Sequence, residues 1–134
     1  MGSTHESLRH ERVVLATLVA SAAKGARWQE LPLLCEAVAG VRGLRAARST
    51  TLHGLAELMA DGRAACRVAA ASGGPRAEFG VRTARPEPPP EGEGSVRYLG
   101  DGRWAARRGE REITGIVGLE EATETAVELM REAA

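Results

Sequence analysis

Residues 48–82 read RSTTLHGLAELMADGRAACRVAAASGGPRAEFGVR, and the stretch changes character halfway along. In the first half, leucines and a methionine recur at three- and four-residue spacing after a Ser-Thr-Thr cap, which predicts a helix over residues 49–61. In the second half, arginines tend to alternate with small or apolar residues on either side of a Ser-Gly-Gly-Pro turn. That pattern predicts two strands within residues 63–85.

The chain before this stretch predicts two further helices. Apolar residues recur at helical spacing over residues 4–25, and the segment ends in a lysine and a glycine, which are typical of a helix C-terminus. Proline is tolerated in the first turn of a helix but not in its interior. Pro32 therefore places the start of the second helix near Leu31, with the residues before it as an extended entry.

The chain after the hairpin predicts a linker and a small appendix. Residues 86–95 are rich in proline, glycine and glutamate. Because proline disrupts helices and cannot donate a backbone hydrogen bond, we expect neither a helix nor a well-paired strand there. Residues 96–134 contain three short strand candidates and a terminal amphipathic helix. The expected fold class is α+β, with a domain over residues 1–85 and a strand-strand-strand-helix segment at the end.

In this order of elements, residues 8–85 resemble the winged helix-turn-helix transcriptional regulators. The best match is STTLHGLAELMADGRAACRV, residues 49–68, which is similar to their recognition helix running into the first wing strand. The resemblance implies three helices plus a two-stranded wing. It also implies a DNA-binding transcriptional regulator with the helix at 49–61 as reader and the hairpin at 63–85 as wing.

The charge distribution is compatible with double-stranded DNA as partner. The net charge is zero, yet residues 42–85 hold eight arginines against three acids, whereas residues 87–134 hold six arginines against eleven acids. Side chains near the start of a recognition helix reach base edges, and flanking basic groups meet phosphates. The expected base-reading residues are Arg48, Ser49, Thr50, Thr51 and His53. The expected phosphate contacts are Arg63, Arg67, Arg76, Arg82 and Arg85.

Other interpretations stay open. Exposed arginines are usually only solvated, and winged-helix folds also serve as protein-binding modules, so the alternative is a non-enzymatic protein-protein interaction adaptor. The terminal segment is also similar to the DNA-reading modules of the AP2 and integrase-arm kind, through Trp104, Arg107 and Arg108. An oligomerisation or regulatory element is a further interpretation, in which the terminal helix joins a homodimer or binds a protein partner through its acidic face. The expected dimer residues are Leu119, Ala126, Leu129 and Met130.

Enzymatic, metal-binding and membrane classes are disfavoured. The sequence has no phosphate-binding loop, no nucleophile elbow and no HExxH pattern, and its two cysteines, Cys35 and Cys66, belong to no Cys/His cluster. We therefore expect no catalytic residues, no metal and no cofactor. No stretch reaches the about 20 apolar residues that span a bilayer, so we expect a cytoplasmic protein without a membrane partner.

Overall fold

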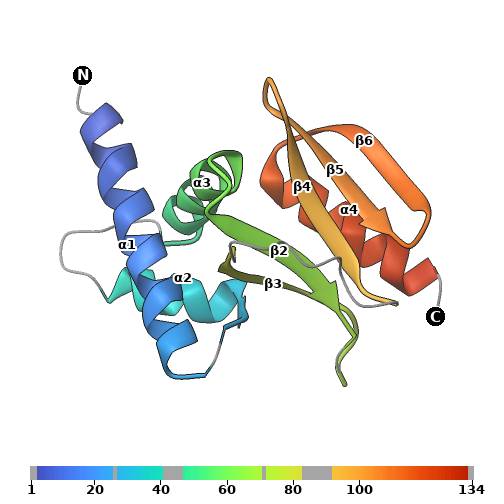
Figure 1. Ribbon diagram of the computed structural model, residues 1–134, viewed down its shortest axis with the longest axis horizontal. Coiled ribbons are helices and arrows are strands. Elements are labelled where there is room, and N and C mark those ends of the chain that lie inside the picture. Colours follow the sequence, from blue (N-terminus) through green and yellow to red (C-terminus); the bar gives the residue numbers. More distant parts are fainter. Residues whose placement is uncertain (1–2, 26, 41–46, 71, 83–91, 133–134) are drawn as a thin grey trace.

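The computed structural model describes residues 3–25, 27–40, 47–70, 72–82 and 92–132 (Figure 1). Within them the fold is α+β, with four helices and one antiparallel sheet of six strands. The elements in chain order are α1 (Ser3–Ala23), β1 (Gln29–Glu30), α2 (Leu31–Ala39), α3 (Ala47–Ala60), β2 (Ala64–Ala69), β3 (Arg76–Val81), β4 (Gly94–Gly100), β5 (Arg103–Arg108), β6 (Arg111–Val117) and α4 (Leu119–Glu132).

Local sequence signals set the helix ends. α2 begins at Leu31, as predicted, and Pro32 lies in its first turn. Glu30, directly before the helix, has an extended backbone. α3 ends at Ala60 and is followed by Gly62, whose φ of 75° is one that glycine adopts readily. The Gly62 N–H donates to the Met59 carbonyl at 3.1 Å, and the next N–H, of Arg63, donates to the Leu58 carbonyl at 2.8 Å. These two bonds form a Schellman motif, which stops the helix and starts the hairpin.

The sheet is larger than the two-stranded wing expected from the sequence. Its strand order is β1-β3-β2-β4-β5-β6, so the β2–β3 hairpin continues on both sides. β1 pairs with β3, and β4 pairs with β2 through Cys66 opposite Val96 and Val68 opposite Gly94. A two-stranded hairpin leaves ladder groups unpaired along its edges, and β4 satisfies part of the β2 edge. The C-terminal segment therefore extends the same sheet.

The three strands and terminal helix expected after the linker are present, with the first strand starting at Gly94. The greater part of the expected linker lies outside the described residues. α4 lies behind β4, β5 and β6 in the view of Figure 1. Glycine at position 94 has a packing reason, because a Cβ there would lie 3.2 Å from the Arg107 carbonyl oxygen and 3.3 Å from Cβ of Val68.

The two faces of the sheet differ in chemistry. Residues paired across antiparallel strands present their side chains on the same face. One such row, Phe79, Cys66, Val96 and Ala106, is buried and belongs to the same core as apolar residues of all four helices. We call this the inner face. The neighbouring row lies on the opposite side, the outer face, and consists of Glu78, Arg67, Ser95, Arg107 and Glu112.

Among the described residues, no helix combines the length and apolar character that a membrane span requires. The longest, α1, has 21 residues but carries charged side chains along its first half.

Candidate nucleic-acid interface

The expected base-reading residues of α3 divide into an exposed and a buried group. Arg48, Ser49 and His53 are exposed. Thr50 and Thr51 are buried, and Thr51 has no solvent exposure at all. Thr51 lies on the same stripe of the helix as Leu55 and Leu58, which face the core. The expectation that Thr50 and Thr51 read bases is therefore wrong for this arrangement, because a buried hydroxyl cannot reach a base edge.

Arg48 connects the start of α3 to the start of α4. Its Nη2 lies 3.5 Å from Oε2 of Glu120, and the two side chains are 61% and 50% exposed. Exposed ion pairs of this kind contribute about 0–1 kcal/mol. Arg48 can therefore leave Glu120 for another anion at little cost.

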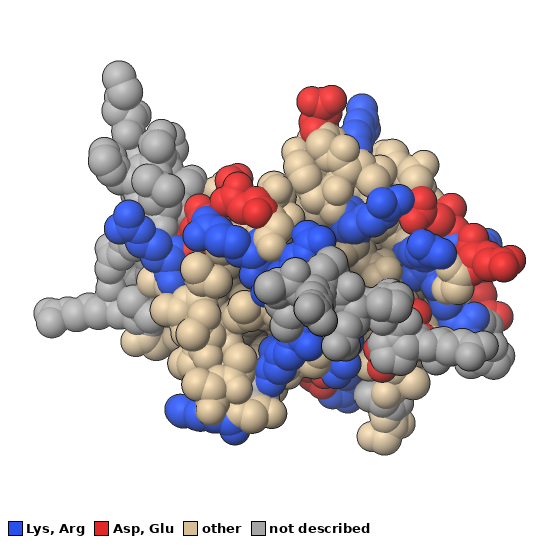
Figure 2. All heavy atoms as spheres, in the orientation of Figure 1, with Lys and Arg blue, Asp and Glu red and all other residues tan. Residues whose placement is uncertain are grey.

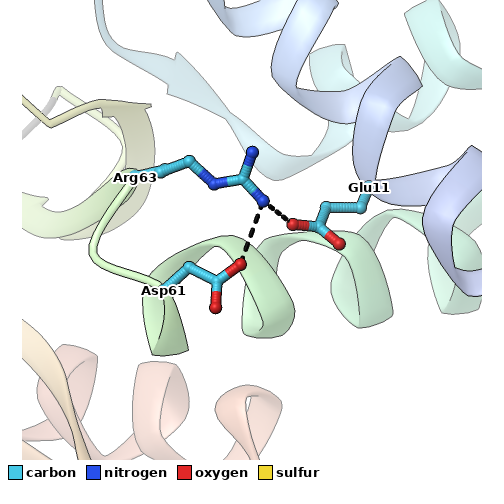
Figure 3. A network of polar contacts seen from close by, with 3 residues as sticks. All are labelled: Glu11, Asp61 and Arg63. Carbon is cyan, nitrogen blue, oxygen red and sulfur yellow. Dashed lines mark hydrogen bonds and ion pairs between the residues drawn. The ribbon is translucent and has the colours of Figure 1, made fainter.

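Arg63 has a different environment, which Figure 3 shows. Its Nη2 donates to Oε1 of Glu11 in α1 and, at 2.9 Å, to Oδ2 of Asp61 at the end of α3. The Glu11 side chain is only 9% exposed. Burial raises the pKa of the Glu11 carboxyl, and the neighbouring Arg63 opposes that rise. Arg63 is thus held as the counter-ion of a nearly buried carboxylate.

Arg67 is fixed on the outer face by two contacts. Its Nε donates to Oε1 of Glu78 at 3.0 Å, and its guanidinium carbon lies 4.5 Å from the centroid of the Trp28 ring. The side chain is 28% exposed. A cation over a tryptophan face contributes about 0.5–2 kcal/mol, so moving Arg67 to a phosphate would lose that contact.

The remaining phosphate candidates are more accessible. Arg76 donates to both carboxylate oxygens of Glu30 at 3.2 Å, and its side chain is half exposed. Arg82 follows β3, is exposed, and has no carboxylate partner within the described part of the chain. Arg85 lies outside the described residues.

The outer face adds Arg97 and Arg103, which the sequence analysis did not assign, and Arg107, which it named only through the resemblance to the AP2 and integrase-arm modules. Arg97, Arg103 and Arg107 lie on it, because the register pairs Arg107 with Ser95 and places Arg97 opposite Ala105. Figure 2 shows basic side chains spread across this face of the molecule, with acidic side chains along its upper edge and gathered at its right-hand edge. Only the pairing of β2 with β4 brings these groups to one surface, and no local sequence signal predicts that pairing.

The expected dimer face of α4 is occupied within the chain. Leu119, Ala126, Leu129 and Met130 are all buried in the core beneath β4 and β5. Since that face already packs on the sheet, a contact with a second copy through these residues would require α4 to leave the sheet, and their role in a dimer stays a prediction. Trp104 is likewise buried on the inner face, with its ring 5.0 Å from that of Tyr98, so it does not lie on an open sheet surface.

Neither protein-family models nor curated proteins nor solved structures match this chain. The roles of its residues are therefore inferred from which side chains are exposed and which are held in ion pairs or hydrogen bonds.

Metal binding and thiol chemistry both require groups that the described residues do not bring together. Among the described residues, no group of histidine, cysteine and carboxylate side chains is placed to hold a metal ion. Both cysteines are free, and Cys66 is buried in β2. Burial strongly raises the pKa of the Cys66 thiol, which keeps it protonated and unreactive.

Proposed function

We propose that the protein is a DNA-binding transcriptional regulator, with residues 3–82 forming a winged helix-turn-helix unit. The observation that carries this proposal is the chain order of three helices and a hairpin, with α3 leading directly into β2 through the Schellman turn at Gly62. α3 would be the reader and the β2–β3 hairpin the wing. A helix used in this way presents exposed side chains near its N-terminal end to base edges in the major groove.

The structure divides the arginines by how easily each exchanges its partner. Arg48 and Arg76 lie in exposed ion pairs, and Arg82 has no carboxylate partner within the described residues, so these three are the proposed DNA contacts. Arg63 and Arg67 hold the protein together through Glu11 and Trp28 and are no longer proposed as phosphate contacts. Ser49 and His53 remain proposed reading residues because their side chains are exposed.

The alternative function is a protein-binding adaptor, and the exposed face of α4 favours it. Glu120, Glu121, Glu124, Glu128 and Glu132 are exposed along that helix, against Arg131 as its one cation. A basic protein segment would complement this surface, whereas duplex DNA would be repelled. A homodimer stays a proposal as well, and while α4 packs on the sheet its contact would lie away from the buried face of that helix.

The test is fluorescence anisotropy with labelled duplexes at several salt concentrations. Arg48→Ala should weaken binding to the preferred site by about 1–3 kcal/mol and binding to scrambled duplex much less. Arg76→Ala and Arg82→Ala should weaken both alike, and each should make the salt slope shallower by about one ion.

Arg131→Ala provides the matched control. Arg131 is 61% exposed, like Arg48, and is also ion-paired, to Glu128 at 2.7 Å, but it lies on α4. Its replacement should leave DNA binding unchanged. If wild-type protein shows no duplex affinity at low salt, the DNA proposal is wrong and the adaptor function takes its place.

A further inference from the structure

A groove of about 370 Å³ lies between β2 and β4, where the two strands cease to pair. The two strands pair from Cys66 to Val68, opposite Val96 to Gly94, and the ladder between them is not continued toward Ala64 and Tyr98. Met59, at the end of α3, also lines the space. The groove therefore joins the hairpin, the third helix and the C-terminal strands, and it is separate from the exposed side of α3 proposed to read DNA.

Three arginines line the groove, Arg27, Arg82 and Arg97, and none of its described lining residues is acidic. Arg97 forms an ion pair with Glu112 on the exposed outer face, with 3.2 Å between Nη2 and Oε1. Arg82 has no carboxylate partner within the described part of the chain. Guanidinium groups keep their charge at any ordinary pH, so the groove concentrates positive charge.

The Arg27 guanidinium is incompletely hydrogen-bonded within the described residues. Its Nε is buried and has no hydrogen-bond partner among the described residues. Its Nη2 donates to the Val81 carbonyl at 3.5 Å, the long limit for such a bond. Buried donors are normally satisfied, and an unsatisfied donor on a charged group is costly. An anion in the groove would supply acceptor oxygens to this guanidinium.

The opposite lining of the groove is apolar. Met59, Cys66 and Val96 contribute buried side chains, and the half-buried Tyr98 adds an aromatic ring. A ligand that fits must therefore combine an anionic group with an apolar body. Phosphate suits three guanidinium groups better than carboxylate does, because it carries up to two charges and three strongly accepting oxygens.

We propose that this groove binds a small organic phosphate with an apolar or aromatic body. The phosphate contacts Arg27, Arg82 and Arg97, and the body packs on Met59 and Val96. Since the ligand would touch both β2 and β4, its binding would stabilise the junction between the hairpin and the C-terminal strands. This ligand site shares Arg82 with the proposed DNA contacts, but it goes beyond the proposed DNA binding and does not depend on it.

The test is isothermal titration calorimetry of the full chain with phenyl phosphate at constant ionic strength, beside inorganic phosphate and phenol. Phenyl phosphate should bind one per chain, inorganic phosphate more weakly, and phenol not measurably. Arg82→Gln and Arg97→Gln should each weaken phenyl phosphate binding by about tenfold or more, since each removes a charge-assisted hydrogen bond. Arg82→Lys should retain part of the affinity, which separates loss of the charge from loss of the fold.

Arg103→Gln is the matched control, because Arg103 is exposed on the same outer face but does not line the groove. Its replacement should change the affinity less than about twofold. The proposal is overturned if phenyl phosphate shows no saturable binding, if Arg103→Gln weakens binding as much as Arg82→Gln does, or if phenyl phosphate binds no better than inorganic phosphate. It is also overturned if the Arg82 and Arg97 substitutions weaken the binding of duplex DNA but not the binding of any small phosphate.

Discussion

Trp28 lies directly over Gly80. A Cβ built on Gly80 would come within 3.1 Å of Cε3 of the indole ring and 2.8 Å of the Arg27 carbonyl oxygen. The same ring lies 4.5 Å from the guanidinium carbon of Arg67. Because Gly80 has no side chain, the chain before β1 can cross the outer face there. Trp28 can then lie against the guanidinium group of Arg67.

We expect Gly80→Ala to destabilise the fold by about 1–3 kcal/mol, as overpacking of a filled site does. Urea unfolding followed by circular dichroism measures the change. Gly40→Ala is the control, because Gly40 has an ordinary helical backbone with φ of −71° and its Cβ would meet nothing nearer than 3.4 Å. Equal stabilities for the two variants would contradict the packing of Trp28 on Gly80.

Arg63→Ala should lower stability and leave DNA affinity unchanged. It removes a bond to the nearly buried Glu11 carboxylate, and an unpartnered buried acceptor costs about 1–3 kcal/mol. Because Arg63 itself is 48% exposed and water reaches it, we expect the lower half of that range. Arg131→Ala, at an exposed pair, should cost under about 0.5 kcal/mol in the same urea titration. If Arg63→Ala lost DNA binding without losing stability, Arg63 would instead be a DNA contact.

The pH dependence of stability should carry a contribution from Glu11. Its pKa is raised in the folded protein, first by burial, so the native state binds the proton more tightly than the unfolded chain does. The stability that protonation gives is fully present below the unfolded pKa and is lost as pH rises through the raised native pKa. Glu11→Gln cannot titrate. The unfolding free energy of wild type minus that of Glu11→Gln should therefore fall as pH rises from about 4 to 8. A difference that grows with pH would show that Arg63 outweighs burial.

Leu129→Ala should destabilise the fold by about 2–4 kcal/mol and leave the oligomeric state as it is. Leu129 is 4% exposed and packs in the core beneath the sheet. Urea unfolding gives the first quantity, and light scattering at several concentrations gives the second. Glu124→Ala, on the exposed side of the same helix, should change neither. A Leu129→Ala variant that dissociated into stable monomers would instead support the dimer helix expected from the sequence.

The sequence by itself determined the local elements of this chain. Proline at position 32 fixed where α2 begins, glycine at position 62 fixed where α3 ends, and the Ser-Gly-Gly-Pro turn separated β2 from β3. Each of these signals acts through the conformations of a few neighbouring residues, which is why one sequence is enough to identify them. The terminal three strands and helix were predictable for the same reason.

Tertiary structure alone decided which side chains are available for function. The pairs that hold Arg63 and Arg76 link residues 52 and 46 positions apart, to Glu11 and Glu30, and periodicity contains no information about such partners. The apolar stripe of α4 indicated that the helix must be covered, but the sheet rather than a second copy covers it. The groove lined by Arg27, Arg82 and Arg97, and the grouping of arginines on the outer face, arise where β4 meets the edge of β2. Strand pairing of this kind depends on the summed packing and hydrogen bonding of distant segments, which no single stretch of the sequence specifies.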